Sequence, residues 1–159
     1  RPFEEFRAVS EAAGAYSPAS ADGKRPGVFY VNTYDLAARP KYAMEALYLH
    51  EAVPGHHYQI SLAQEATDMP RFRRFAYDTA YGEGWALYAE SLGRDLGLYT
   101  DGHSQFGALS AEMWRAVRLV VDTGLREAHP RAVRAAARKA ASASVAIRGD
   151  RRMVHLPSD

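Results

Sequence analysis

Apolar residues recur every three or four positions in several stretches of the chain, which is the period of a helix with one buried face. The pattern is clearest over residues 81–96, where Gly97 is placed to end a helix, and over residues 109–125. A third helix is predicted to start at Pro40, because proline suits the first position of a helix. Pro54 interrupts this third pattern, which then resumes.

Other regions carry different or weaker signals. Residues 28–32 are mostly β-branched or aromatic and follow a Pro-Gly turn, so they predict a short strand. Residues 1–25 mix a helical pattern with turn residues and predict a short helix followed by a surface loop. A further helix is predicted over residues 71–77. The expected fold class is therefore mainly α, with one short strand or hairpin.

Composition narrows the chemistry. The 159 residues are 47% hydrophobic and 25% charged, which is ordinary for a folded domain with its own core. No apolar run approaches the ~18 residues of a membrane span, and no signal sequence opens the chain. A cytoplasmic location is the default expectation, with export left open for a longer form that starts before Arg1. Because cysteine is absent, a metal site would have to use His, Asp and Glu.

Charge is uneven along the chain. Residues 126–159 hold eight Lys and Arg residues against three Asp and Glu residues, whereas the rest of the chain is mildly acidic. A basic end of this kind is typical of nucleic-acid contacts, but this one contains no aromatic residue that would stack on a base. We therefore expect a solvated tail and no nucleic-acid partner.

The candidate chemistry lies in the segment His50-Glu51-Ala52-Val53-Pro54-Gly55-His56-His57. Two imidazoles, a separate carboxylate and a glutamate beside the first histidine are the ingredients of a zinc peptidase site. In an unbroken helix, histidines four positions apart share a metal, but here the spacing from His50 is six or seven. In an ideal helix His56 and His57 would lie ~9 and ~10 Å further along the axis, which is too far.

Pro54 and Gly55 provide a distortion that would shorten this spacing. Proline gives no hydrogen bond to the carbonyl of His50, and glycine takes backbone angles that other residues avoid. A two-residue bulge would bring His56 to the first histidine, and a three-residue bulge would bring His57 instead. The smaller distortion favours His56 as the ligand. The other histidine would then contact the substrate or support a ligand.

Three glutamates complete the predicted site. Glu51 would act as general base and proton shuttle for the attacking water. Glu83 would be the third ligand, from a neighbouring helix, because Gly82 and Gly84 on either side allow close approach. Glu90 lies seven residues further along, on the same helical face, and would orient a ligand histidine through its carboxylate.

Two arginines on the helix predicted over residues 109–125 are further candidates. Arg115 and Arg118 would bind a carboxylate of the substrate, since guanidinium groups pair well with carboxylates. The alternative is that they pair with acidic residues on neighbouring helices. In that case they would hold helices together and would not touch the substrate.

Four segments of the chain resemble the bacterial domain-of-unknown-function family 885. These segments are residues 26–32, 50–59, 83–88 and 118–125. That family in turn resembles the gluzincin metallopeptidases, which implies a helical gluzincin-like metallopeptidase core that is a fragment of a larger helical fold. The resemblance implies one zinc ion held by His50, His56 and Glu83. It further implies Glu51 as the base that activates water, and a peptide as the substrate.

The resemblance ends near Leu125. Residues 1–125 are therefore expected to form the catalytic core, and residues 126–159 a basic, Ala/Arg-rich divergent tail. The family continues with a histidine where this chain has Arg126, and later with a proline-glycine-aromatic segment that is not found here. Related peptidases use His or Tyr to stabilise the oxyanion. The competing expectation is a truncated remnant that binds metal without catalysis.

Overall fold

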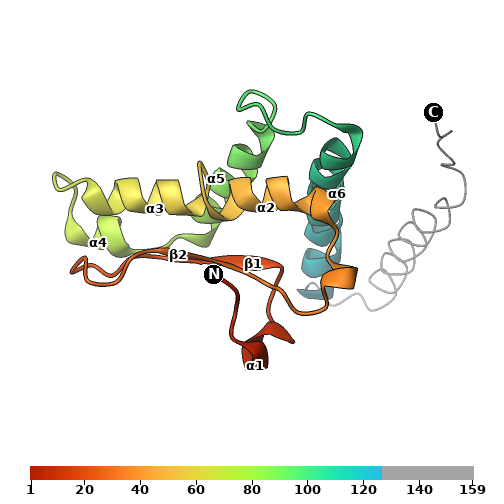
Figure 1. The fold of residues 1–159 in the computed structure, drawn as a ribbon. Coiled ribbons are helices and arrows are strands. Elements are labelled where there is room, and N and C mark those ends of the chain that lie inside the picture. The colour runs from red at the N-terminus through yellow and green to blue at the C-terminus, as the bar shows by residue number, and fades with distance from the viewer. Residues whose placement is uncertain (127–159) are drawn as a thin grey trace, which may run out of the picture. The chain divides into compact units, whose positions relative to one another are not determined.

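The computed structural model describes residues 1–126, which form a mainly helical structure with one two-stranded hairpin (Figure 1). The fold class expected from the sequence is confirmed. The chain divides into two compact units, Arg1–Ala111 and Glu112–Asp159. Of the expected basic tail, only Arg126 lies within the described residues. None of the described helices is long and apolar enough to span a lipid bilayer.

The hairpin joins β1 (Gly14–Ser17) to β2 (Val28–Val31), which pair antiparallel with Tyr16 opposite Phe29. β2 lies where the sequence predicts a strand. β1 lies in the predicted surface loop, and that expectation is wrong. Its sequence, Gly-Ala-Tyr-Ser, contains a single residue that favours strands. The hydrogen-bonded pairing with β2 therefore stabilises this strand, because its own residues have little preference for one.

Asn32 fastens the hairpin to the N-terminal segment, which contains the single-turn helix α1 (Glu5–Ala8). Its side chain is buried, and its Nδ2 donates to three backbone carbonyl oxygens at 2.8–3.1 Å, those of Ala8, Glu11 and Ala12. A buried amide left unpaired would cost stability, so these bonds are a condition for burying it.

Two helices lie nearly in line above the hairpin (Figure 1). After the 3₁₀ turns Leu36–Ala38 and Lys41–Ala43, α2 covers Met44–Glu51 and α3 covers His56–Glu65. The interruption predicted at Pro54 is confirmed. However, it is not a bulge within one helix, because residues 52–55 form a bend between two separate helices.

Three further helices complete the described structure: α4 (Arg71–Phe75), α5 (Thr79–Ser91) and α6 (Gly102–Arg126). α2 packs against α5 and β1, while α3 packs against α4 and α5. The side chain of Asp78 caps α5 by accepting a hydrogen bond from the backbone N–H of Tyr81 at 2.8 Å. The helix α5 therefore lies beside both helices that carry the predicted histidines.

The end of α5 differs from the sequence-based expectation, because the helix stops at Ser91 instead of reaching residue 96. The chain turns back so that Tyr99 is buried beneath this end of the helix. The hydroxyl of Tyr99 donates to the carbonyl oxygen of Glu90 at 3.1 Å. Its ring lies where a Cβ on Gly93 would be, so only glycine fits there. Gly97 does have a positive φ of 80°, but it follows the helix by several residues.

The start of α6 also differs, since the helix begins at Gly102, earlier than the predicted residue 109. Asp101 caps this end by accepting hydrogen bonds from the backbone N–H groups of His103 and Ser104 at 2.7 and 3.0 Å. Apolar periodicity identifies only the part of a helix that has an apolar face. The first two turns of α6 are mostly polar, so this pattern does not predict them.

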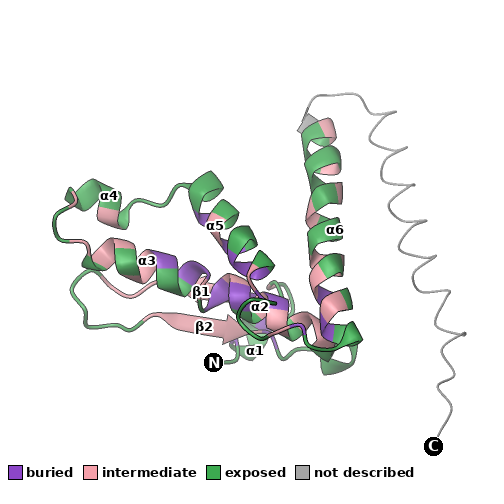
Figure 2. Cartoon of the chain, turned by 90° about the horizontal axis from the view of Figure 1, so that it is seen from above, coloured by how far each residue is buried: buried purple, intermediate pink, exposed green. Residues whose placement is uncertain are grey.

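The hydrophobic core is small. Ala46 and Leu49 of α2 pack with Tyr99, and Leu98 and Ala108 lie against them. Figure 2 places the buried residues mainly in α2, at the start of α3 and along α5. Four ionisable or amide side chains are buried in the same helices: Glu51, His56, Gln59 and Glu90. Burial of such groups is costly unless they are paired or bind a ligand, so they indicate a functional site.

Candidate metal centre

The bend between α2 and α3 brings His50 and His56 together. His50 lies in the last turn of α2, and His56 is the first residue of α3. Their ring centroids are 4.7 Å apart, with the ring planes at 86°. Gly55 makes this approach possible, because a Cβ at that position would collide with the carbonyl oxygens of Leu49 and His50. The chain therefore turns directly on the end of α2.

Glu83 reaches the two histidines from α5. Its Oε2 lies 3.3 Å from His50 Nε2, and its Oε1 lies 3.7 Å from His56 Nε2. Ligand-type atoms of the three residues all lie within 4.8 Å of one another. Three helices, α2, α3 and α5, thus each contribute one donor group to a single cluster.

The spacing of these atoms fits a small divalent cation. A tetrahedral zinc site with bonds of ~2.0–2.1 Å holds its ligand atoms roughly 3.3–3.5 Å apart. The two nitrogen–oxygen distances of 3.3 and 3.7 Å are close to that spacing. Two imidazoles and one carboxylate are also the donor set of catalytic zinc sites that keep a fourth position open. The cluster His50, His56 and Glu83 could therefore hold a metal ion.

Tyr77 holds Glu83 in place from the segment that precedes α5. Its hydroxyl donates to Glu83 Oε1 at 3.0 Å. Burial first, and then the hydrogen bond and charge of Glu83, raise the pKa of Tyr77 to about 12, so the phenol keeps its proton at neutral pH. The ring lies against Gly82, where a Cβ would meet ring atoms at 2.5 Å. No other atom of residues 1–126 lies within 4 Å of the Cβ position of Gly84, so within that part of the chain close packing requires Gly82 and not Gly84.

Glu90 holds His50 from the opposite side of the ring. Its Oε1 lies 2.6 Å from His50 Nδ1, and its side chain is buried. A carboxylate at this nitrogen fixes both the tautomer and the orientation of a ligand histidine. On the other side of the ring, Nε2 of His50 lies 3.3 Å from Glu83 Oε2.

Replacing Glu90 by glutamine tests this orienting role. The shape of the side chain is kept, but the negative charge that favours a proton on His50 Nδ1 is lost. We expect zinc affinity, measured by competition with a fluorescent chelator, to fall by roughly 10–100-fold. The stoichiometry should stay at one ion per chain. An unchanged affinity would show that Glu90 fills space without supporting the ligand.

Glu51 is buried directly after the first histidine, with 8% of its surface exposed. Burial raises the pKa of its carboxyl, against the opposing effects of His50 and of a backbone hydrogen bond from Tyr16. The charges of Glu83 and Glu90 raise this pKa further. A carboxylate whose pKa is raised is a stronger base, which is the property that proton abstraction from water needs.

His56 is also held in the form that a metal requires. Burial first, and then the positive charge of a protonated His50, lower the pKa of His56, so the neutral imidazole is favoured. Metals bind the neutral ring. Its Nδ1 is buried and has no hydrogen-bond partner among the described residues, so no hydrogen bond from that part of the chain fixes the ring at this nitrogen.

The other predicted residues lie elsewhere. His57 is exposed on α3, and its Nδ1 lies 3.0 Å from the hydroxyl oxygen of Tyr16, outside the cluster. Arg118 belongs to the second unit and pairs with Asp122 of its own helix at 2.9–3.0 Å. Arg115 lies one turn earlier on α6. Roles for these side chains in substrate binding stay predictions.

Sequence reasoning missed three residues that shape the site. Tyr77 and Tyr16 touch Glu83 and Glu51, but they are two of ten tyrosines and follow no spacing rule that singles them out. Trp85 donates from Nε1 to the carbonyl oxygen of Pro54 at 2.7 Å, which ties the bend to α5. The contacts of Tyr16 and Trp85 join segments that lie far apart in the sequence, so no local pattern predicts them.

Comparison with known proteins places the chain among bacterial relatives. Residues 1–147 match the family described as bacterial protein of unknown function (DUF885), a match that extends beyond Leu125. A similar crystal structure is that of a protein from Colwellia psychrerythraea, provisionally described as a lipoprotein. The two are 42% identical, with a TM-score of 0.77, over 83% of this chain and 22% of that chain. The chain thus spans about a fifth of that relative's length. No curated protein matches it.

Proposed function

The chain belongs to the family of bacterial proteins of unknown function DUF885, and on that premise we propose that residues 1–125 are the catalytic core of a zinc-dependent peptidase of the gluzincin type. The observation that carries the proposal is the convergence of His50, His56 and Glu83 from three helices. Together with a buried glutamate beside the first histidine, this is the donor set of a hydrolytic zinc site.

In this proposal each residue has a separate task. His50, His56 and Glu83 hold the metal, and Glu90 orients His50. Zinc, when bound, supplies Lewis acidity that polarises a carbonyl group and makes water easier to deprotonate.

Glu51 moves the proton. Its carboxylate accepts a proton from the attacking water and later returns it to the nitrogen of the leaving amine. Tyr77 keeps its proton and donates it to Glu83 Oε1 at 3.0 Å, so in this proposal it holds the third ligand in place.

Removal and return of the metal test the proposal. We expect the zinc-loaded protein to cleave members of a peptide mixture, with the products identified by mass spectrometry. Treatment with a chelator should abolish cleavage, and one equivalent of zinc should restore it, because the three ligands form a single site. Bound zinc without any cleavage by well-folded protein would favour an inactive metal-binding remnant. Cleavage that survives the chelator would contradict the proposed mechanism.

A further inference from the structure

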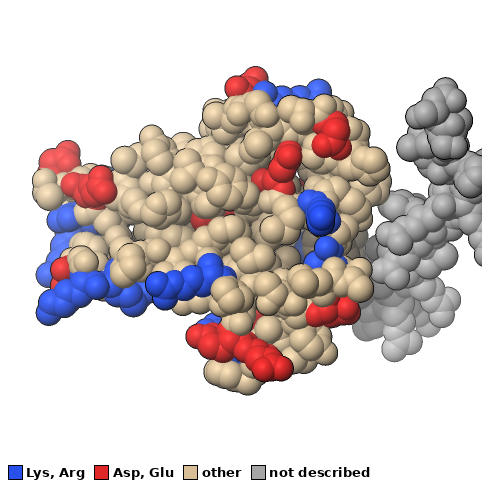
Figure 3. Space-filling model, in the orientation of Figure 1, with Lys and Arg blue, Asp and Glu red and all other residues tan. Residues whose placement is uncertain are grey.

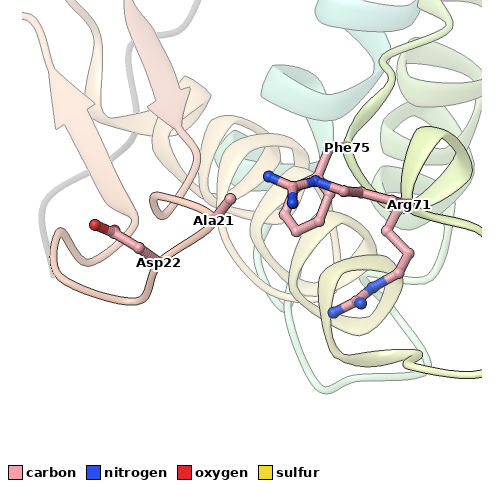
Figure 4. Close-up of a pocket in the computed structure, with 5 residues that line it drawn as sticks. Ala21, Asp22, Arg71 and Phe75 are labelled. Atoms are coloured by element: carbon pink, nitrogen blue, oxygen red, sulfur yellow. The ribbon is translucent and has the colours of Figure 1, made fainter.

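A pocket lies between the β1–β2 loop and α4, and none of its residues belongs to the metal cluster. Its volume is about 380 Å³, and it is lined by Ala21, Asp22, Arg71, Arg74 and Phe75. Figure 4 shows Ala21 and Asp22 on the loop and Arg71 and Phe75 on the helix opposite. The volume lies within the range of pockets that hold small ligands.

Arg74 is fixed in position by other parts of the chain. Its Nε and Nη2 both donate to the carbonyl oxygen of Gln64 near the end of α3. Its guanidinium carbon also lies 5.3 Å from the centre of the Phe75 ring. The side chain is half-buried and forms no ion pair with any described residue. A cation held in this way has donors left over and lacks a counter-charge.

Arg71 has even fewer partners. Its side chain makes no hydrogen bond or ion pair with a described residue, and its guanidinium carbon lies 5.8 Å from the centre of the Phe75 ring. The one carboxylate in the pocket, that of Asp22, is already engaged within its own loop. It accepts from Ser20 Oγ at 2.6 Å and from the backbone N–H of Lys24 at 3.1 Å, and Lys24 Nζ lies 3.6 Å away.

The two segments that form the pocket are strongly positive as a pair. Residues 18–27 contain Lys24, Arg25 and a single acid, and residues 71–75 contain three arginines and no acid. Figure 3 shows Lys and Arg side chains gathered where the β1–β2 loop and α4 lie, with Asp and Glu side chains beside them. An excess of positive charge of this kind attracts anions.

We propose that this pocket binds an oxyanion, a phosphate or carboxylate group, carried by a small molecule whose flat or apolar part lies against Phe75 and Ala21. Two guanidinium groups give the planar, bidentate recognition that suits either anion. The exposed part of the Phe75 ring and the methyl group of Ala21 provide an apolar wall beside them. The inference stands independently of the metal centre, since the two sites share no residue.

Titration with phenyl phosphate, benzoate and phenol tests the pocket on the full chain. A chelator is kept present so that the metal cluster cannot hold the anion. We expect both anions to shift the amide NMR signals of α4 in a saturable way, and phenol to bind at least about tenfold more weakly, because it lacks the charge that the arginines recognise. Tighter binding of phenyl phosphate would point to phosphate esters as ligands, and tighter binding of benzoate to carboxylates.

Arg71→Gln is the decisive variant, because this side chain forms no hydrogen bond with any residue that the structure describes. We expect it to weaken both anions by about 10–100-fold, as for one lost charge-assisted contact. Arg71→Lys should have an affinity between those of the parent and Arg71→Gln. Arg73→Gln is the matched control, since Arg73 is exposed on the same helix but does not line the pocket, and it should change affinity less than about twofold. Equal effects of Arg71→Gln and Arg73→Gln, or phenol binding as tightly as the anions, would overturn the proposal.

Discussion

Alanine in place of His50 is expected to cost the protein its bound zinc. A zinc site of four ligands contributes ~10–16 kcal/mol of binding free energy, so one ligand accounts for roughly 2.5–4 kcal/mol, a loss of ~10²–10³ in affinity. His56→Ala should lose a similar amount, because both rings face Glu83. Elemental analysis of protein after dialysis measures the outcome, with about one zinc per chain expected for the parent.

The adjacent histidine provides a matched control. His57 is a neighbour of His56 in sequence, but it is exposed and its ring contacts Tyr16 instead of the cluster. We expect His57→Ala to keep its zinc. If His57→Ala lost the metal and His56→Ala retained it, the ligand assignment would be wrong, and the bend between α2 and α3 would have to present the other ring.

Glutamine in place of Glu51 is expected to stop hydrolysis while zinc stays bound. An amide has the shape of the carboxylate but cannot accept the proton of the attacking water, so kcat should fall by about 10²–10⁴-fold. Removal of a buried carboxylate whose pKa is raised also relieves a desolvation cost, so the variant should fold at least as well as the parent. Peptide cleavage and zinc content are measured on the same preparation.

Glu65→Gln is the control for that experiment. It makes the same chemical change on an exposed residue at the end of α3, away from the metal cluster, and should leave kcat unchanged. Full activity in Glu51→Gln would contradict the assignment of the base. Loss of zinc together with activity would instead indicate that Glu51 supports the metal ligands.

The sequence predicts the ingredients of the site better than their arrangement. The pairing of His50-Glu51 with a second histidine beyond Pro54 predicts a distorted helix and a metal, and the cluster does contain His56. The form of the distortion was missed, because a proline shows where a helix stops but not how the chain continues. That continuation depends on the contact of Trp85 with Pro54, which lies 31 positions away in the sequence.

The sequence also predicts some elements of the fold and misses others, depending on whether local composition or long-range contacts decide them. Residues 28–32 and the middle of α5 and α6 are recognisable because their own composition favours the structure they adopt. The strand β1 and the early end of α5 are not, since pairing with β2 and the burial of Tyr99 decide them. Local patterns predict elements that are stable by local preference, while long-range contacts set the rest.

The origin of the three ligands on three different helices has a consequence for the survival of the chain in a cell. The hydrophobic core that α2 forms with Tyr99 is small. A metal on His50, His56 and Glu83 would bind only the folded state, in which the three helices meet. Free metal at a thousand times its dissociation constant then adds about 4 kcal/mol to the free energy of unfolding. That is a large share of the ~5–15 kcal/mol that keeps a small domain folded. The concentration of free metal in the cell would therefore determine what fraction of the protein stays folded and resists proteolysis, even in the absence of substrate.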